Sequence, residues 1–92
     1  MAKPKALINF VFTDHALLEM KRRGISETMV SLALTKPEQM ELARAGRVVY
    51  QAKIDLEEPP KTYILRVFVD IDLNPPQVVT AYKTSKIEKY WR

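Results

Sequence analysis

The chain has 92 residues, of which 47% are hydrophobic, and a formal net charge of +4 at pH 7; these values predict a single domain over residues 1–92 with one hydrophobic core. It has no cysteine and one histidine, which excludes disulfides, thiol catalysis, cysteine-based metal sites and a multi-histidine metal site within one chain. No apolar run approaches the roughly 20 residues of a membrane span, and residues 1–12 lack the long apolar region of a signal peptide. We therefore expect a cytoplasmic protein whose excess of cations favours a polyanion or an acidic partner.

Two short amphipathic helices are predicted near the N-terminus. Thr13 and Asp14 are favourable N-cap residues for the first helix, and Gly24 can end it in the left-handed conformation that glycine tolerates. Ser26 is expected to cap the second helix, which Pro37 stops. The apolar residues of both helices form one shared surface, made by Leu17, Met20, Ile25, Val30 and Leu34.

After Pro37 the hydrophobic pattern alternates, which predicts four strands. The strands are expected at residues 39–43, 47–54, 62–71 and 77–84, with turns at 45–46 and 72–76, a polar loop at 56–61 and a helical turn at 86–91 capped by Ser85. Because the connections are short, the strands should form a largely antiparallel sheet. The predicted fold is α+β, with two N-terminal helices packed on one face of a four-stranded sheet.

Alternation along the last two strands separates the two faces of this sheet. Tyr63, Leu65, Val67 and Val69 share one side of their strand, and Ile64, Arg66, Phe68 and Asp70 share the other. On the last strand, Val79 and Ala81 share one side, and Thr80, Tyr82 and Thr84 share the other. Because the apolar sets should meet the helices, Arg66 and Tyr82 are expected on a more open face, together with Thr80, Thr84 and Lys53. Such a surface could hold a phosphate and a base.

The chemistry-bearing residues could support RNA cleavage without a metal. In this reaction the 2′-hydroxyl attacks the adjacent phosphorus, so one group takes its proton, another protonates the leaving 5′ oxygen, and cations neutralise the growing charge. His15 could do either proton transfer at neutral pH, and Tyr82, Lys53 or water could do the other. Arg66 and Arg23 suit charge stabilisation, because a guanidinium grips phosphate oxygens in a fixed fork.

Several of these residues also have a purely structural interpretation. His15 could be a surface or capping residue, and Arg22 and Arg23 could complement the dipole of the first helix. Thr80 and Tyr82 are ordinary strand residues by propensity.

Arg66 and the C-terminal aromatic residues have structural alternatives too. Arg66 could form a cross-strand pair with Glu41 or Asp70. Tyr90 and Trp91 could pack the tail against the sheet edge, or they could stack on a base.

The order of motifs resembles that of a known family. The string HALLEMKRRGIS is followed by a hairpin around RVVYQAK, by YILRVFVD and by VVTAYKTSKIEKYW. This order resembles an uncharacterised bacterial domain-of-unknown-function family, grouped with the RelE-like and BrnT-like toxins in the barnase–EndoU–colicin–RelE ribonuclease superfamily. The resemblance implies two helices on a four-stranded sheet, metal-independent endoribonuclease activity, and the toxin role in a toxin–antitoxin pair.

The resemblance also points to particular residues and partners. The family's functional positions map onto His15, Arg23, Arg66, Thr80 and Tyr82. We take His15, Arg66, Thr80 and Tyr82 as candidate catalytic residues, and Arg22, Arg23, Lys53 and Lys83 as candidate RNA-binding residues. The expected partners are RNA and a small acidic antitoxin protein, and no metal or cofactor is expected. Two alternatives remain: a non-catalytic RNA- or protein-binding module on the same scaffold, and a protein that only docks another protein through an edge strand or the tail.

Overall fold

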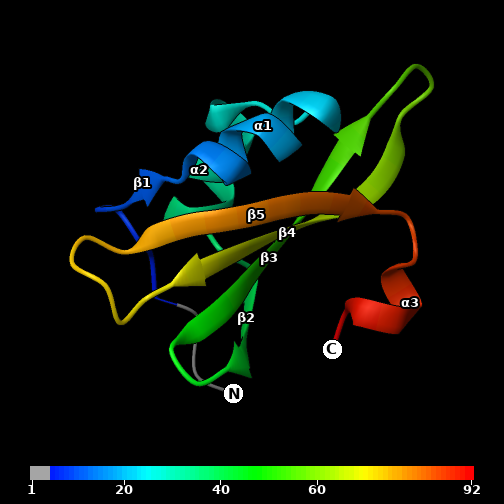
Figure 1. The fold of residues 1–92 in the computed structure, drawn as a ribbon. Helices are drawn as coiled ribbons and strands as arrows, with labels where there is room; N and C mark the ends of the chain where they lie inside the picture. The colour runs from blue at the N-terminus through cyan, green and yellow to red at the C-terminus, as the bar shows by residue number, and fades with distance from the viewer. Residues whose placement is uncertain (1–4) are drawn as a thin grey trace.

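The computed structural model describes residues 5–92; residues 1–4, which belong to the segment judged to lack a signal peptide, lie outside the described part. The elements are β1 (Val11–Phe12), α1 (Asp14–Arg22), α2 (Glu27–Thr35), β2 (Gln39–Arg44), β3 (Arg47–Leu56), β4 (Lys61–Asp70), β5 (Gln77–Thr84) and α3 (Ile87–Tyr90). α1 and α2 lie together over one face of the sheet, and α3 lies past the end of β5 on the other side (Figure 1). None of the helices in residues 5–92 is long and apolar enough to cross a membrane.

Both N-terminal helices begin and end at the residues that the sequence predicts. The Thr13 hydroxyl accepts a hydrogen bond from the Ala16 backbone N–H at 3.0 Å, and the Ser26 hydroxyl accepts one from the Met29 N–H at 3.1 Å. Each bond satisfies a backbone donor that has no partner within the helix. Gly24 follows α1 with a φ of +67°, which confirms the predicted left-handed helix end.

The sheet has five strands within residues 5–92, in the order β1-β5-β4-β3-β2, so the prediction of four strands is wrong while the α+β class is confirmed. The four predicted strands pair antiparallel. The additional strand, β1, pairs parallel with β5 through Val11 and Gln77. Two residues are too few to show an alternating pattern. The pairing forms only because β5, more than 60 residues later in the sequence, returns beside β1.

The hydrophobic core lies between the two N-terminal helices and one face of the sheet. Its buried members include Ala16, Met20, Val30, Leu34, Leu65, Val67 and Val69, as the alternation along β4 predicts. On β5, however, Val78 and Ala81 enter the core, whereas Val79 was expected there. The pairing of β4 with β5 shifts register between Phe68 and Val69. This irregularity interrupts the alternation, which explains why Val78 replaces Val79.

The C-terminal segment covers part of the face that the sequence predicts to be open. The helical turn is confirmed as α3, but the predicted cap is wrong: Lys86 is the N-cap and makes no side-chain capping bond. The Thr84 hydroxyl accepts the Lys86 N–H instead, at 3.1 Å. The end of α3 lies against β3, where the Gln51 side chain donates to the Tyr90 carbonyl at 3.2 Å.

Candidate functional site

Arg66 lies in the middle of β4, on the face of the sheet that points away from α1 and α2. Its neighbours across the sheet are Gln51 on β3 and Tyr82 on β5. The Arg66 Nε donates to Gln51 Oε1 at 2.6 Å, Nη1 donates to the Tyr82 hydroxyl oxygen, and Nη2 donates to Glu41 Oε1 at 3.1 Å. Each guanidinium nitrogen therefore has a protein acceptor, which explains how a side chain only 10% exposed can remain charged.

These contacts decide between the two structural partners that the sequence leaves open for Arg66. Glu41 forms the expected cross-strand ion pair. Asp70 instead pairs with Arg47, whose Nε lies 2.6 Å from Asp70 Oδ1.

Three aromatic rings surround the Arg66 guanidinium. Its Cζ lies 4.3 Å from the ring centroid of Tyr90, 5.4 Å from that of Phe68 and 5.6 Å from that of Tyr82. All three distances fall within the range of cation–π attraction. Phe68 and Tyr82 are also stacked, with centroids 6.0 Å apart. We call the set of Arg66, Glu41, Gln51, Tyr82 and Tyr90 the Arg66 cluster.

The two tyrosines of the Arg66 cluster differ in how readily they lose a proton. Burial raises the pKa of Tyr82, and this effect outweighs the hydrogen bond from Arg66. The pKa of Tyr90 is lowered, first by its hydrogen bond with Tyr82 and then by Lys89 and Arg66. Tyr82 therefore holds its proton to a higher pH than Tyr90, and Tyr90 is the one of the two that ionises first as the pH rises.

Side chains of β2 and β3 hold the C-terminal tail next to Arg66. Gln39 donates to the Arg92 carbonyl at 2.7 Å and accepts from the Arg92 N–H at 3.1 Å. Gln51, which is 1% exposed, donates both to Gln39 and to the Tyr90 carbonyl. Glu41 joins the two parts, because its second oxygen accepts from the Arg92 side chain at 3.2 Å.

His15 lies in a separate group of residues at the edge of β5. Its Nε2 is 3.8 Å from Glu19 Oε1, and its side chain is 69% exposed. Glu19 also lies 3.9 Å from Arg22 and 3.3 Å from Arg23. Arg23 then donates to the Thr80 hydroxyl at 3.3 Å and to the Ala81 carbonyl. We call His15, Glu19, Arg22, Arg23 and Thr80 the β5-edge cluster.

The sheet separates His15 from Arg66. Ala16 and Met20 of α1 pack in the core with Leu65 and Val67, whereas Arg66 lies between those two strand residues and points to the opposite face. The structure therefore brings Arg66 and Tyr82 together, and Arg22, Arg23 and Thr80 together, but it does not bring His15 to Arg66.

The two candidate lysines lie apart from each other. The Lys53 ammonium lies over the Trp91 ring, 4.4 Å from its centroid, and is therefore beside the tail on the Arg66 face. The Lys83 ammonium lies beside Gly24 at the end of α1, 3.8 Å from where a Cβ would stand. Only Lys53 is thus close to the C-terminal tail that borders the Arg66 cluster.

Sequence reasoning missed the role of Gln51 and the place of Tyr90 beside Arg66. The alternating pattern could have assigned Gln51 to the Arg66 face, because the two residues are paired across β3 and β4. No local pattern brings Tyr90 there, since its position depends on the tail folding back over the sheet. Within residues 5–92, no group of three or more His, Cys, Asp or Glu residues is arranged to hold a metal ion.

Residues 12–86 match a family model described as "Domain of unknown function (DUF4258)". No curated protein and no solved structure matches the chain.

Proposed function

The chain belongs to the DUF4258 family, whose description assigns no activity, and from this premise we propose that it is a metal-independent endoribonuclease that acts at the Arg66 cluster. The observation that carries the proposal is the meeting of one cation and two tyrosines on one face of the sheet, where Arg66 donates to the Tyr82 hydroxyl and lies 4.3 Å from the centroid of the Tyr90 ring. RNA cleavage by the 2′-hydroxyl requires a proton acceptor, a proton donor and a positive charge. This set supplies all three when one tyrosine is ionised and the other is neutral.

Each member of the cluster has a distinct role in this proposal. Tyr90, whose pKa is lowered, ionises before Tyr82, and its phenolate takes the proton of the attacking 2′-hydroxyl to become a neutral phenol. Tyr82, whose raised pKa keeps its hydroxyl protonated, gives that proton to the leaving 5′ oxygen and is left as a phenolate beside Arg66. Arg66 stabilises the charge on the phosphate oxygens with the N–H groups that its three protein acceptors leave unused. The proposal keeps Arg66 and Tyr82 from the sequence-based site and replaces His15 with Tyr90.

The biological role that we propose is that of the toxin in a toxin–antitoxin pair, with RNA as substrate and a small acidic protein as the neutralising partner. The excess of cations supports both partners, because a formal charge of +4 attracts a polyanion and an acidic protein alike. This part of the proposal depends on the resemblance to RelE-like and BrnT-like toxins. A reading frame for a small acidic protein beside that of this chain would support it.

Cleavage of RNA in EDTA tests the proposed site. We expect the purified protein to cut RNA, and a substrate with 2′-deoxyribose at the cut position to resist. Tyr90→Phe should reduce the rate by on the order of 10²-fold or more, as expected for loss of a general base. His15→Ala is the matched control and should retain the wild-type rate. Full activity in Tyr90→Phe, together with loss of activity in His15→Ala, would move the site to the β5-edge cluster.

A non-catalytic RNA-binding module is the second candidate, and the packing of Arg66 favours it. A guanidinium with a protein acceptor at every nitrogen could serve only to fix the tail on the sheet. This alternative predicts salt-sensitive RNA binding without strand scission. The cleavage assay in EDTA, run beside a binding assay, separates the two functions.

A further inference from the structure

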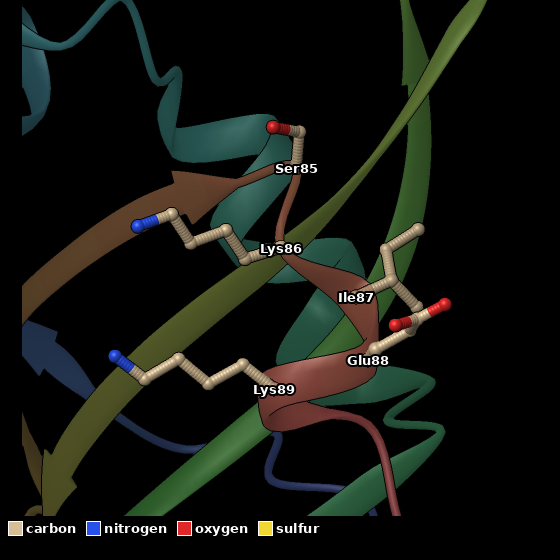
Figure 2. Close-up of a pocket in the computed structure, with 5 residues that line it drawn as sticks. All are labelled: Ser85, Lys86, Ile87, Glu88 and Lys89. Atoms are coloured by element: carbon tan, nitrogen blue, oxygen red, sulfur yellow. The ribbon is translucent and has the colours of Figure 1, made fainter.

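A hollow beside α3 contains two lysines that the proposed reaction does not use. Ser85, Lys86, Ile87, Glu88 and Lys89 line this space of about 620 Å³. Figure 2 shows the side chains of Lys86 and Lys89 extending next to each other in the same direction, while Ile87 and Glu88 point to the opposite side of α3. The two ammonium groups are thus presented together, away from the carboxylate that lies between them in the sequence.

Within residues 5–92, these lysines have no carboxylate partner, unlike the arginines on the Arg66 face. Arg66 and Arg92 both pair with Glu41, and the Lys53 ammonium lies over Trp91. Within residues 5–92, no ion pair involves Lys86 or Lys89. Both side chains are exposed, so they can bind an anion without first giving up an ionic contact.

The hollow adjoins the Arg66 cluster through consecutive residues of α3. Lys89 precedes Tyr90, and its ammonium lies 5.3 Å from the centroid of the Tyr90 ring. The Tyr90 ring in turn lies 4.3 Å from the Arg66 guanidinium. A nucleic-acid strand carries a phosphate at every nucleotide. If one phosphate of the strand lies at Arg66, a neighbouring phosphate is therefore within reach of the lysines.

We propose that Lys86 and Lys89 form a phosphate subsite that binds the RNA backbone beside the bond that is cut. This inference rests on the proposed function, since it takes an RNA strand at the Arg66 cluster as its ligand. It defines the substrate further: an RNA strand that carries at least one phosphate beyond the scissile one, rather than a dinucleotide.

Binding of an RNA that cannot be cut tests the subsite without using activity. The probe is a short fluorescent oligoribonucleotide with 2′-O-methyl groups throughout, and the readout is fluorescence anisotropy over a range of salt concentrations. In the variant with Lys86→Gln and Lys89→Gln, we expect weaker binding and a salt dependence of log K that is reduced by roughly 0.7 for each lysine removed. The matched control carries Lys36→Gln and Lys61→Gln, which remove the same charge from exposed positions elsewhere.

The outcomes separate the subsite from the proposed function. An unchanged affinity in the Lys86 and Lys89 variant would overturn the subsite, and so would an equal loss in the control, because net charge alone would then explain the binding. Neither result would affect cleavage of RNA by the wild-type protein. If the wild-type protein binds the methylated strand through these lysines but cuts no RNA, the subsite stands and the nuclease function fails. If it neither binds nor cuts, both fail.

Discussion

At the scale of single residues, Arg66 shows what a strand needs in order to bury a charge. Removing a cation from water costs several kcal/mol unless it is paired and hydrogen-bonded. Gln51 and Tyr82 meet this need from the neighbouring strands, and Glu41 supplies the opposite charge. The same contacts determine where Tyr82 and Glu41 point. The contacts that stabilise the buried Arg66 therefore also position the side chains of the proposed site.

The ion pair between Arg47 and Asp70 predicts a dependence of stability on pH. Both Asp70 oxygens accept from Arg47, at 2.6 and 3.0 Å, and this hydrogen bonding holds the pKa of Asp70 below its ordinary value of 3.8. A carboxyl whose pKa is lower in the folded state contributes stability that is fully present above the unfolded-state pKa. That contribution is lost as the pH falls through the lower, folded-state pKa.

Urea unfolding of the wild-type protein and Asp70→Asn at a series of pH values measures this contribution. We expect the wild-type protein to have the larger free energy of unfolding at neutral pH, and the difference to shrink as the pH falls below about 3.8. Glu58→Gln, at an exposed position in the loop after β3, is the control and should show little difference at any pH. A difference for Asp70→Asn that stays constant to the lowest pH at which the protein folds would contradict the prediction.

At the scale of elements, Gly24 follows α1 and Gly46 lies in the turn between β2 and β3. The two positions differ in how much space an added Cβ would have. Gly46 has a φ of +79°, and a Cβ there would lie 2.5 Å from Asp72 Oδ2. Gly24 has a φ of +67°, but the nearest atom, Lys83 Nζ, would be 3.8 Å away. Both alanine variants should lose about 1 kcal/mol of stability to backbone strain. Gly46→Ala should lose more, because the Asp72 side chain must also move.

Urea unfolding of the two glycine variants, and of Gly46→Ala combined with Asp72→Ala, separates these effects. Removing the Asp72 carboxylate should bring the loss caused by Gly46→Ala close to that caused by Gly24→Ala. Equal losses in the two single variants would show that the contact with Asp72 has no energetic effect.

The elements that the sequence predicts correctly are those with local signals. Thr13 and Ser26 cap helices through hydrogen bonds to residues three positions on, so the capping pattern is contained in a few neighbouring residues. β1 has no such signal, because its two residues are defined only by pairing with β5. Val78 takes the core position expected for Val79 because of a register shift between two strands, which the sequence of one strand does not reveal.

At the scale of the whole molecule, the sequence predicts only the part of the candidate site that is formed by neighbouring strands. Alternation and antiparallel pairing place Arg66 and Tyr82 on one face, and they are partners across β4 and β5. His15 was grouped with Arg66 because of the chemistry of the two side chains. This grouping is not found in the structure, because the sheet lies between them. Tyr90 reaches Arg66 because the tail folds back onto β2 and β3, a contact between distant segments that the residues of the tail do not encode by themselves.

The tail is attached mainly through side chains, which predicts that it can open without unfolding of the sheet. Gln39 makes two hydrogen bonds to the backbone of Arg92 and accepts a third from Gln51. Each such bond contributes about 1 kcal/mol, so Gln39→Ala should raise the population of the open tail markedly. Trp91 is the only tryptophan of the chain, and its fluorescence therefore reports on the tail alone.

In Gln39→Ala we expect Trp91 emission to shift to the red and to be quenched more readily by iodide, and the Arg92 amide to exchange hydrogen faster. Amides in the centre of β4 should keep their protection, because local opening does not require the core to separate. Gln77→Ala, at the opposite end of the sheet beside β1, is the control and should leave Trp91 emission unchanged. If exchange in β4 instead accelerates together with that of Arg92, the tail and the sheet open as one cooperative unit. The Arg66 cluster could then admit RNA only through the exposed surface that the closed tail leaves.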